Sequence, residues 1–288
     1  MAIGLRNAIL QAAVQGKLTE RESGDEPAKT LLERIRAERA EMVKRGEAKA
    51  PKGGESVIER HDDGSVWEKR GKGDWVDITE EISFDIPDEW EWARLVDIGA
   101  IVGGGTPKTE KKEYWASGDE GYPWMTPADM GAIKEKYLIR GARNITDEGL
   151  AGSSAQLMPA GSVLMSSRAP IGYLGIASNP ICTNQGFKSV VPAVMDTSIW
   201  IYWSIAALME NIKERASGTT FKEISGAEFG RTIIPVPSIQ EQQRIVAKLE
   251  EMLPKVEHAE ALDVKRMELT KVFPDAMRAS ILQAAVKG

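Results

Sequence analysis

From Ser238 to Gly288 the chain reads SIQEQQRIVAKLEEMLPKVEHAEALDVKRMELTKVFPDAMRASILQAAVKG. No proline or glycine interrupts its first sixteen residues, and apolar side chains recur at alternating steps of four and three, at Ile245, Leu249, Met252, Val256 and Ala259. This spacing is typical of a coiled-coil seam. Ser238 and Glu241 have the spacing of a capping box at its start. A helix from there to Val286 would be about 70 Å long at 1.5 Å per residue, so the stretch predicts a long spacer helix.

Two prolines lie inside this pattern. Pro254 and Pro274 each remove a backbone hydrogen bond, so the sequence predicts bends near Met252 and Val272. Two or three separate helices in a bundle are the alternative, because an interior proline more often ends a helix than bends it.

The last twelve residues repeat a segment near the start of the chain. Met277–Gly288 reads MRASILQAAVKG and Leu5–Gly16 reads LRNAILQAAVQG, with eight of twelve positions identical. The first copy predicts a helix from Leu5 to Val14, which Gly16 ends as a carboxyl-terminal cap. This helix is too short to cover the whole apolar stripe of the spacer, so we expect a second chain to cover it.

The rest of the amino-terminal third divides into a helix and a polar segment. Residues 28–45 have an amphipathic pattern, and we expect the helices within residues 1–45 to pack on the spacer. Residues 46–83 are rich in glycine and lysine and predict a mobile linker or a loose hairpin that turns through His61–Gly64. The recognisable domain follows at residues 84–237.

The composition indicates one ordinary core. Of 288 residues, 42% are hydrophobic and 28% are charged, which suffices for one domain plus accessory helices. The single Cys182 excludes an internal disulfide, and no apolar run has the length of a membrane span or follows a signal-like start. We therefore expect a cytoplasmic protein with no membrane partner.

The net charge of −6 argues against a nucleic-acid partner until its distribution is considered. Residues 1–90 carry 15 basic and 20 acidic side chains, whereas the rest of the chain is close to balance. Gly149–Met195 contains no Asp or Glu, only Arg168 and Lys188, and many uncharged polar side chains. Such a surface can approach phosphates without repulsion, although a plain domain core would have the same composition.

Short β-rich pieces mark the middle domain. Ser162–Ser166, Tyr173–Ala177 and Lys188–Val191 are separated by glycine and proline at close intervals, which favours a mixed, mostly antiparallel sheet with small helices. A glycine-rich turn, Gly103–Pro107, follows a predicted strand at Leu95–Ile101. It is no nucleotide cradle, because no Gly-Lys-Ser/Thr follows and its proline has no N–H to donate. The predicted fold class is α+β, with a β-rich domain between short amino-terminal helices and a long coiled-coil-type helix.

Eight short motifs follow one another in the region 84–243. They are Gly104-Gly105-Thr106-Pro107, Tyr122-Pro123-Trp124-Met125-Thr126 with Asp129, Ile145-Thr146 with Gly149-Leu150, Gly161 with Val163-Leu164, Ser167-Arg168 with Ile171-Gly172, Thr183-Asn184-Gln185-Gly186, Gly218-Thr219-Thr220, and Ile234-Pro235-Val236-Pro237 with Glu241-Gln242. Each is weak alone. In this order they resemble the specificity (S) subunits of type I restriction-modification systems.

This resemblance implies a target-recognition domain followed by a spacer helix, in a subunit that recognises a DNA sequence and performs no chemistry. It implies duplex DNA as the ligand, and methyltransferase (M) and restriction (R) subunits as partners that are directed to a bipartite target. S-adenosylmethionine and ATP are then expected on those partner subunits, with no cofactor on this chain.

A typical S subunit has two recognition domains and two long helices, whereas this chain has one of each. Two copies related by a two-fold axis would restore the pair, bury the seam and recognise two short inverted blocks separated by a fixed gap. This interpretation predicts self-association through the spacer helix or pairing with another half-subunit. The alternative is the carboxyl-terminal half of a longer subunit.

Side chains that suit base edges in the major groove are Arg or Lys for guanine and Asn or Gln for adenine. With residues that can contact phosphate, the predicted DNA-binding set is Lys108, Lys111, Lys112, Arg143, Arg168, Asn184, Gln185, Lys188, Thr219, Thr220 and Lys222. Thr183–Gln185 is equally compatible with a structural turn. The predicted partner-binding residues of the spacer are Gln240, Arg244, Ile245, Lys248, Leu249, Met252 and Val256. For the charged ones, a solvated helix face is the alternative.

Two other functions fit less well. A hydrolase would need a base with a nucleophile or metal ligands, but the two histidines, His61 and His258, belong to different regions and form no cluster. A coiled-coil scaffold without DNA specificity would explain the ends of the chain but not the ordered motifs between them. Sequence-selective binding to duplex DNA would separate an S subunit from both.

Overall fold

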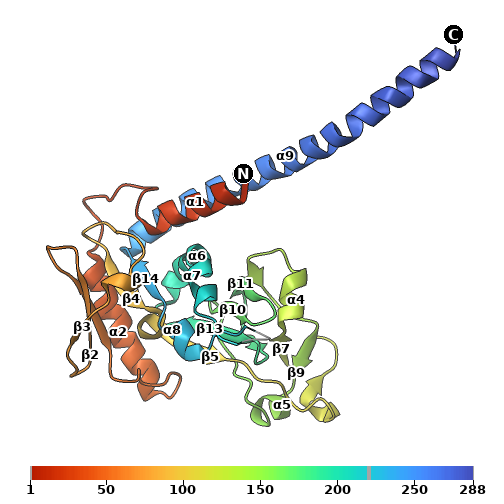
Figure 1. Ribbon diagram of the computed structural model, residues 1–288. Coiled ribbons are helices and arrows are strands. Elements are labelled where there is room, and N and C mark those ends of the chain that lie inside the picture. The colour runs from red at the N-terminus through yellow and green to blue at the C-terminus, as the bar shows by residue number, and fades with distance from the viewer. Residues whose placement is uncertain (1, 219–221, 288) are drawn as a thin grey trace.

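The computed structural model describes residues 2–218 and 222–287 (Figure 1). Their strands form four sheets. A three-stranded sheet contains, in order, β1 (Ser56–Arg60), β2 (Val66–Arg70) and β3 (Trp75–Asp77). A five-stranded sheet contains β5 (Gly99–Gly103), β13 (Phe187–Pro192), β10 (Val163–Ser167), β11 (Ile171–Ala177) and β8 (Tyr137–Leu138). A four-stranded sheet contains β12 (Cys182–Thr183), β7 (Tyr122–Met125), β9 (Arg143–Ile145) and β6 (Trp115–Ala116), and β14 (Ile233–Val236) pairs with β4 (Glu91–Arg94).

The helices of the described residues lie around and beyond these sheets. They are α1 (Ala2–Val14), α2 (Ala28–Lys44), α3 (Leu95–Ile98), α4 (Pro127–Ala132), α5 (Asp147–Ala151), α6 (Ser198–Ala207), α7 (Met209–Glu214), α8 (Gly226–Gly230) and α9 (Ile239–Lys287). Within this part of the chain, no helix is long and apolar enough to cross a membrane.

The sheets confirm the predicted fold class. The pairs β11–β8 and β12–β7 are parallel, and the other strand pairs are antiparallel. The three predicted β-rich pieces correspond to β10, β11 and β13. The predicted strand at 95–101 is wrong in its first half, which forms α3, and β5 begins only at Gly99. A Cβ atom at Gly99 would lie 2.5 Å from the Val191 carbonyl oxygen, so glycine is needed where β5 meets β13.

The spacer is one helix of 49 residues, about 74 Å long at 1.5 Å per residue. The Ser238 hydroxyl accepts a hydrogen bond from the Glu241 N–H at 3.1 Å, as expected for a cap. Pro254 and Pro274 both lie within the helix, so the alternative of separate helices is wrong. Figure 1 shows α9 as a gently curved rod that extends away from the domain.

The base of α9 is covered from within the chain. The α1 side chains Leu10 and Val14 are buried in the same cluster as Ile245 and Leu249, and α6 packs beside them. The expectation that another chain covers this half of the stripe is therefore wrong. Beyond it, Leu262, Val264 and Met267 are exposed at 54%, 57% and 60%. At the end of α1, Gly16 has the predicted capping role, with φ of +69°.

The remaining amino-terminal elements pack on the recognition domain. Helix α2 contacts α3, β4 and β5, whereas the sequence predicted packing on the spacer. The segment 46–83, for which a mobile linker or a loose hairpin was predicted, contains the β1–β2 hairpin and adds β3 to it. Ile58 and Val66 of this sheet are buried in the main core. The hairpin is therefore an integral part of the fold.

Candidate nucleic-acid interface

Arg168 and Lys188 lie together where β10 ends beside β13. The Lys188 ammonium is 3.2 Å from one carboxylate oxygen of Glu223, and the Arg168 guanidinium is 3.7 Å from the other. The backbone of Glu223 also bridges to Arg168, which brings exposed Lys222 to the same edge. We call Arg168, Lys188, Lys222 and Glu223 the β10–β13 cluster. Gly149–Met195 contains no Asp or Glu in its sequence, but the fold places the carboxylate of Glu223 beside it.

Two predicted members of this edge, Thr219 and Thr220, lie outside the described residues. The sequence had no signal for the position of Glu223. The contact depends on Glu223 and Ile224 lying beside the end of β10, where the Ile224 N–H donates to the Ser167 carbonyl at 3.1 Å.

A second basic group lies over the four-stranded sheet. Lys108, Lys111 and Lys112 are exposed in the loop after β5. The Arg143 guanidinium carbon lies 3.2 Å from the ring centroid of Trp115, a cation–π contact that fixes the exposed arginine on β9. Trp115 in turn packs edge-on against buried Trp124, with ring centroids 5.1 Å apart. These four cations lie on the protein surface and do not line a buried binding site.

Asn184 and Gln185 lie between the two basic groups and differ in role. The Asn184 side-chain oxygen accepts the Gly186 N–H at 2.8 Å, so this residue builds its own turn. A Cβ atom at Gly104 would lie 2.0 Å from the Asn184 carbonyl oxygen, which explains the glycine there. Gln185 is exposed and accepts a hydrogen bond from the Thr106 hydroxyl. Of the two, only Gln185 presents its side chain at the surface.

Most predicted partner-binding residues at the base of the spacer are already engaged. Ile245, Leu249 and Val256 are buried within the chain. Arg244 donates to the carboxylate of Asp25 at 2.8 Å, and this hydrogen bond is the main reason that the pKa of Asp25 lies below its ordinary value. Gln240 is exposed, while Lys248 and Met252 are half-buried, so these three remain open to a partner.

Sequence reasoning missed a chain of paired charges that joins the amino-terminal sheet to the domain. Arg94, 2% exposed, donates to Glu68 at 2.7 Å and to Glu81 at 2.9 Å. Burial alone would lower the pKa of Arg94, but these hydrogen bonds raise it. The sequence signal was weak, because the partners are 26 and 13 residues away.

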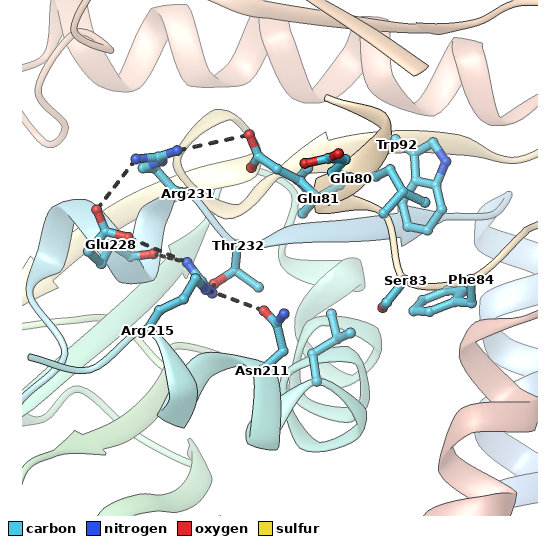
Figure 2. Close-up of a pocket in the computed structure, with 13 residues that line it drawn as sticks. Glu80, Glu81, Ser83, Phe84, Trp92, Asn211, Arg215, Glu228, Arg231 and Thr232 are labelled. Atoms are coloured by element: carbon cyan, nitrogen blue, oxygen red, sulfur yellow. Dashed lines mark hydrogen bonds and ion pairs between the residues drawn. The ribbon is translucent and has the colours of Figure 1, made fainter. Parts of the chain in front are cut away.

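The chain of charges continues around a cavity of about 170 Å³ (Figure 2). Arg231 lies between Glu81, at 3.9 Å, and Glu228, at 3.5 Å. Arg215 reaches the Glu228 carbonyl oxygen at 2.7 Å and the Thr232 hydroxyl at 2.6 Å. Each of these arginines pairs with an acidic side chain, so the arginines around the cavity act as a structural joint.

The described residues contain neither an activated cysteine nor a cluster of metal ligands. Burial raises the pKa of the Cys182 thiol to about 12, so it is not a nucleophile at neutral pH. Among these residues, no group of three His, Cys, Asp or Glu side chains is placed to hold a metal ion. His61 stacks on Trp67 with ring centroids 5.9 Å apart, far from the basic groups in the sequence.

Comparison with known proteins identifies the family. The family model for the type I restriction modification DNA specificity domain matches residues 87–262. The type I restriction enzyme MjaIX specificity subunit of Methanocaldococcus jannaschii is 40% identical over 166 residues, and the EcoR124I/EcoR124II specificity subunit of Escherichia coli is 35% identical over 169. These matches cover 57% and 56% of this chain but 38% and 40% of the relatives, so the chain spans about two fifths of their length.

A solved structure points the same way. It was described for the complex assembly and conformational transition of the type I R-M system. The match covers 66% of this chain and 45% of the chain in that structure, with 26% sequence identity and a TM-score of 0.50. The matched family region includes the β10–β13 cluster, the second basic group over the four-stranded sheet, and the first half of the spacer. The chain therefore belongs to the family of type I restriction modification DNA specificity domains.

Proposed function

We propose that this chain selects a duplex DNA sequence for a type I restriction-modification complex and performs no chemistry itself. The observation that carries the proposal is the β10–β13 cluster, in which the fold brings Arg168 and Lys188 to one surface edge. Lys108, Lys111, Lys112 and Arg143 extend this surface over the neighbouring sheet. Membership of the specificity family supports DNA as the ligand.

In the absence of DNA, Glu223 pairs with both Arg168 and Lys188, offsets one of their two positive charges and holds their side chains in place. A guanine edge can replace this carboxylate at Arg168, because guanidinium donors match guanine O6 and N7. A phosphate can replace it at Lys188. Lys108, Lys111 and Lys112 are then positioning contacts to the backbone, and Gln185 is the exposed amide that can reach adenine.

Methyltransferase and restriction subunits are the proposed partners, with the spacer helix as their platform. S-adenosylmethionine and ATP would bind to those subunits and not to this chain. The solved structure that matches this fold comes from work on assembly of such a system, which supports docking of this kind. A scaffold without DNA specificity, the alternative from the sequence, has no support in the comparisons.

Self-association is a further part of the proposal. The distal half of α9 carries exposed Leu262, Val264 and Met267, which no element of this chain covers among the residues described. A second spacer helix, antiparallel to the first, would cover them and place two recognition domains at opposite ends. Such a pair would recognise a target of two separated blocks.

The test uses the complex of this chain with the methyltransferase subunit of its own system. Binding to a pool of random duplexes identifies the preferred target. Arg168→Ala should then weaken binding to that target about 5- to 150-fold and relax the preference at one base pair.

Glu223→Gln is the matched control, since it removes the competing carboxylate and should strengthen binding to all duplexes alike. A wild-type complex that binds all duplexes equally would refute sequence recognition. A uniform loss of affinity for all sequences in Arg168→Ala would assign Arg168 to phosphate instead of a base.

A further inference from the structure

A groove of about 1050 Å³ separates the β1–β3 sheet from the recognition domain. One wall comes from β2 and β3, and the opposite wall from α8 and β5. Figure 1 shows the sheet of β2 and β3 at the edge of the molecule. Most of the first wall precedes residue 87, where the match to the specificity family begins. The groove is therefore built between the region that the family model matches and a sheet that precedes it in the chain.

The lining of the groove has an excess of positive charge. Six basic side chains face three acidic ones: Lys49, Lys52, Arg70, Arg94, Lys188 and Arg231 against Glu68, Asp74 and Glu81. Arg70, Arg94, Lys188 and Arg231 each pair with an acidic side chain. Among the described residues, the lining cations outside such ion pairs are the exposed lysines Lys49 and Lys52. A polyanion is the ligand that such a groove attracts.

The lysines lie on a wall that the fold holds in place. Arg39, 3% exposed, donates to the Lys49 carbonyl at 3.0 Å and to the Val96 carbonyl at 2.9 Å, which fastens this segment to α3. The Gly71 N–H donates to the Glu55 carbonyl at 2.9 Å, which ties the following loop to the end of β2. The cations are thus presented at fixed positions and not on a loose tail.

The groove opens onto the β10–β13 cluster. Lys188 belongs to both, and a Cβ atom at Gly226 of the groove wall would lie 3.7 Å from its side chain. The remaining lining is largely glycine and apolar side chains such as Val76 and Ile101, which offer no hydrogen bonds to base edges. A ligand in the groove would therefore be bound without regard to base sequence.

We propose that the sugar-phosphate backbone of DNA flanking the recognised block lies in this groove, with phosphates at Lys49 and Lys52. The inference rests on the proposed function, since it extends the same DNA beyond the β10–β13 cluster. The β1–β3 sheet then lengthens the DNA interface and raises affinity, while the choice of sequence stays with the recognition domain.

The experiment compares two duplexes with the complex of this chain and its methyltransferase subunit. One carries the preferred target alone and the other carries it with flanks on both sides. In Lys49→Gln/Lys52→Gln, affinity for the flanked duplex should fall and the slope of log K against log salt should decrease by about 0.9 for each lost phosphate contact. Preference for the target over other sequences should not change, and the short duplex should bind as before.

Lys17→Gln/Lys44→Gln is the matched control, because it removes the same charge from exposed lysines that do not line the groove. An equal loss in this control, or an unchanged salt slope in the groove variant, would overturn the inference and leave sequence recognition intact. A wild-type complex without target preference would instead refute the proposed function itself.

Discussion

Arg94 is the residue on which the joint between the amino-terminal sheet and the domain depends. It is almost fully buried and pairs with Glu68 of β2 and Glu81 of the turn that follows β3. Glu68 is itself only 8% exposed. A buried ion pair adds little stability compared with apolar residues, but loss of one partner leaves an uncompensated charge.

Arg94→Met should therefore lower the free energy of unfolding by about 3–5 kcal/mol, measured by urea denaturation at neutral pH. The double variant Arg94→Met/Glu68→Leu removes both charges and should recover most of this loss. Equal destabilisation by the single and double variants would show that packing of the arginine stem, and not charge, holds the joint.

The same pair gives a pH dependence. Burial by itself would raise the pKa of Glu68, but the hydrogen bonds from Arg94 and Ser56 hold it below the ordinary 4.5. Since the folded-state pKa is depressed, the stabilisation is present above about pH 4.5 and is lost as the pH falls through the folded pKa. The difference in stability between wild type and Arg94→Met should shrink in that acidic range.

Among the elements, α9 is unusual because it continues through two prolines. Its base is packed under α1 and α6, and this tertiary support offsets the cost of the proline nearest to it, Pro254. Pro254 is exposed, and it lies between Leu253 and Val256, the last side chains of α9 that are buried in the core. The α1 sequence is repeated at the end of the chain, but Ile9 is 6% exposed and the corresponding Ile281 is 59% exposed. Local sequence therefore does not decide which of the two copies is buried.

Pro254→Ala should stabilise the protein, by up to about 3 kcal/mol, because alanine restores the N–H donor and relieves the clash of the ring with the preceding turn. Urea denaturation followed by circular dichroism measures the change. Lys255→Ala, at an exposed position in the same turn, is the control and should change stability little. A loss of stability in Pro254→Ala would contradict this account of the helix.

At the scale of the whole molecule, the exposed distal half of α9 predicts a dimer. Light scattering over a range of concentrations should give about twice the chain mass of 31.5 kDa. Leu262→Glu/Met267→Glu places charges on the apolar positions and should shift the protein toward a monomer.

Lys265→Gln, an exposed change on the same helix, should leave the mass unchanged. A wild-type protein that stays monomeric at all concentrations would rule out self-pairing. It would favour a fragment whose second recognition domain lies elsewhere.

The sequence by itself determined the elements whose signals are local. The helical period and the cap at Ser238 predicted where α9 begins, Gly16 predicted the end of α1, and glycine and proline spacing predicted β10, β11 and β13. The order of motifs predicted the family. These features depend on neighbours a few residues away, where backbone geometry and hydrophobic periodicity dominate.

Only the tertiary structure decided which surfaces are free. Packing of α1 buried Ile245 and Leu249, which had the pattern of an open seam. Pairing of Glu223 with the end of β10 placed its carboxylate between Arg168 and Lys188. The hairpin that had the composition of a linker became a wall of the groove. Each of these outcomes depends on contacts between segments distant in the chain, and side-chain spacing along one segment carries no information about which distant segment will cover it.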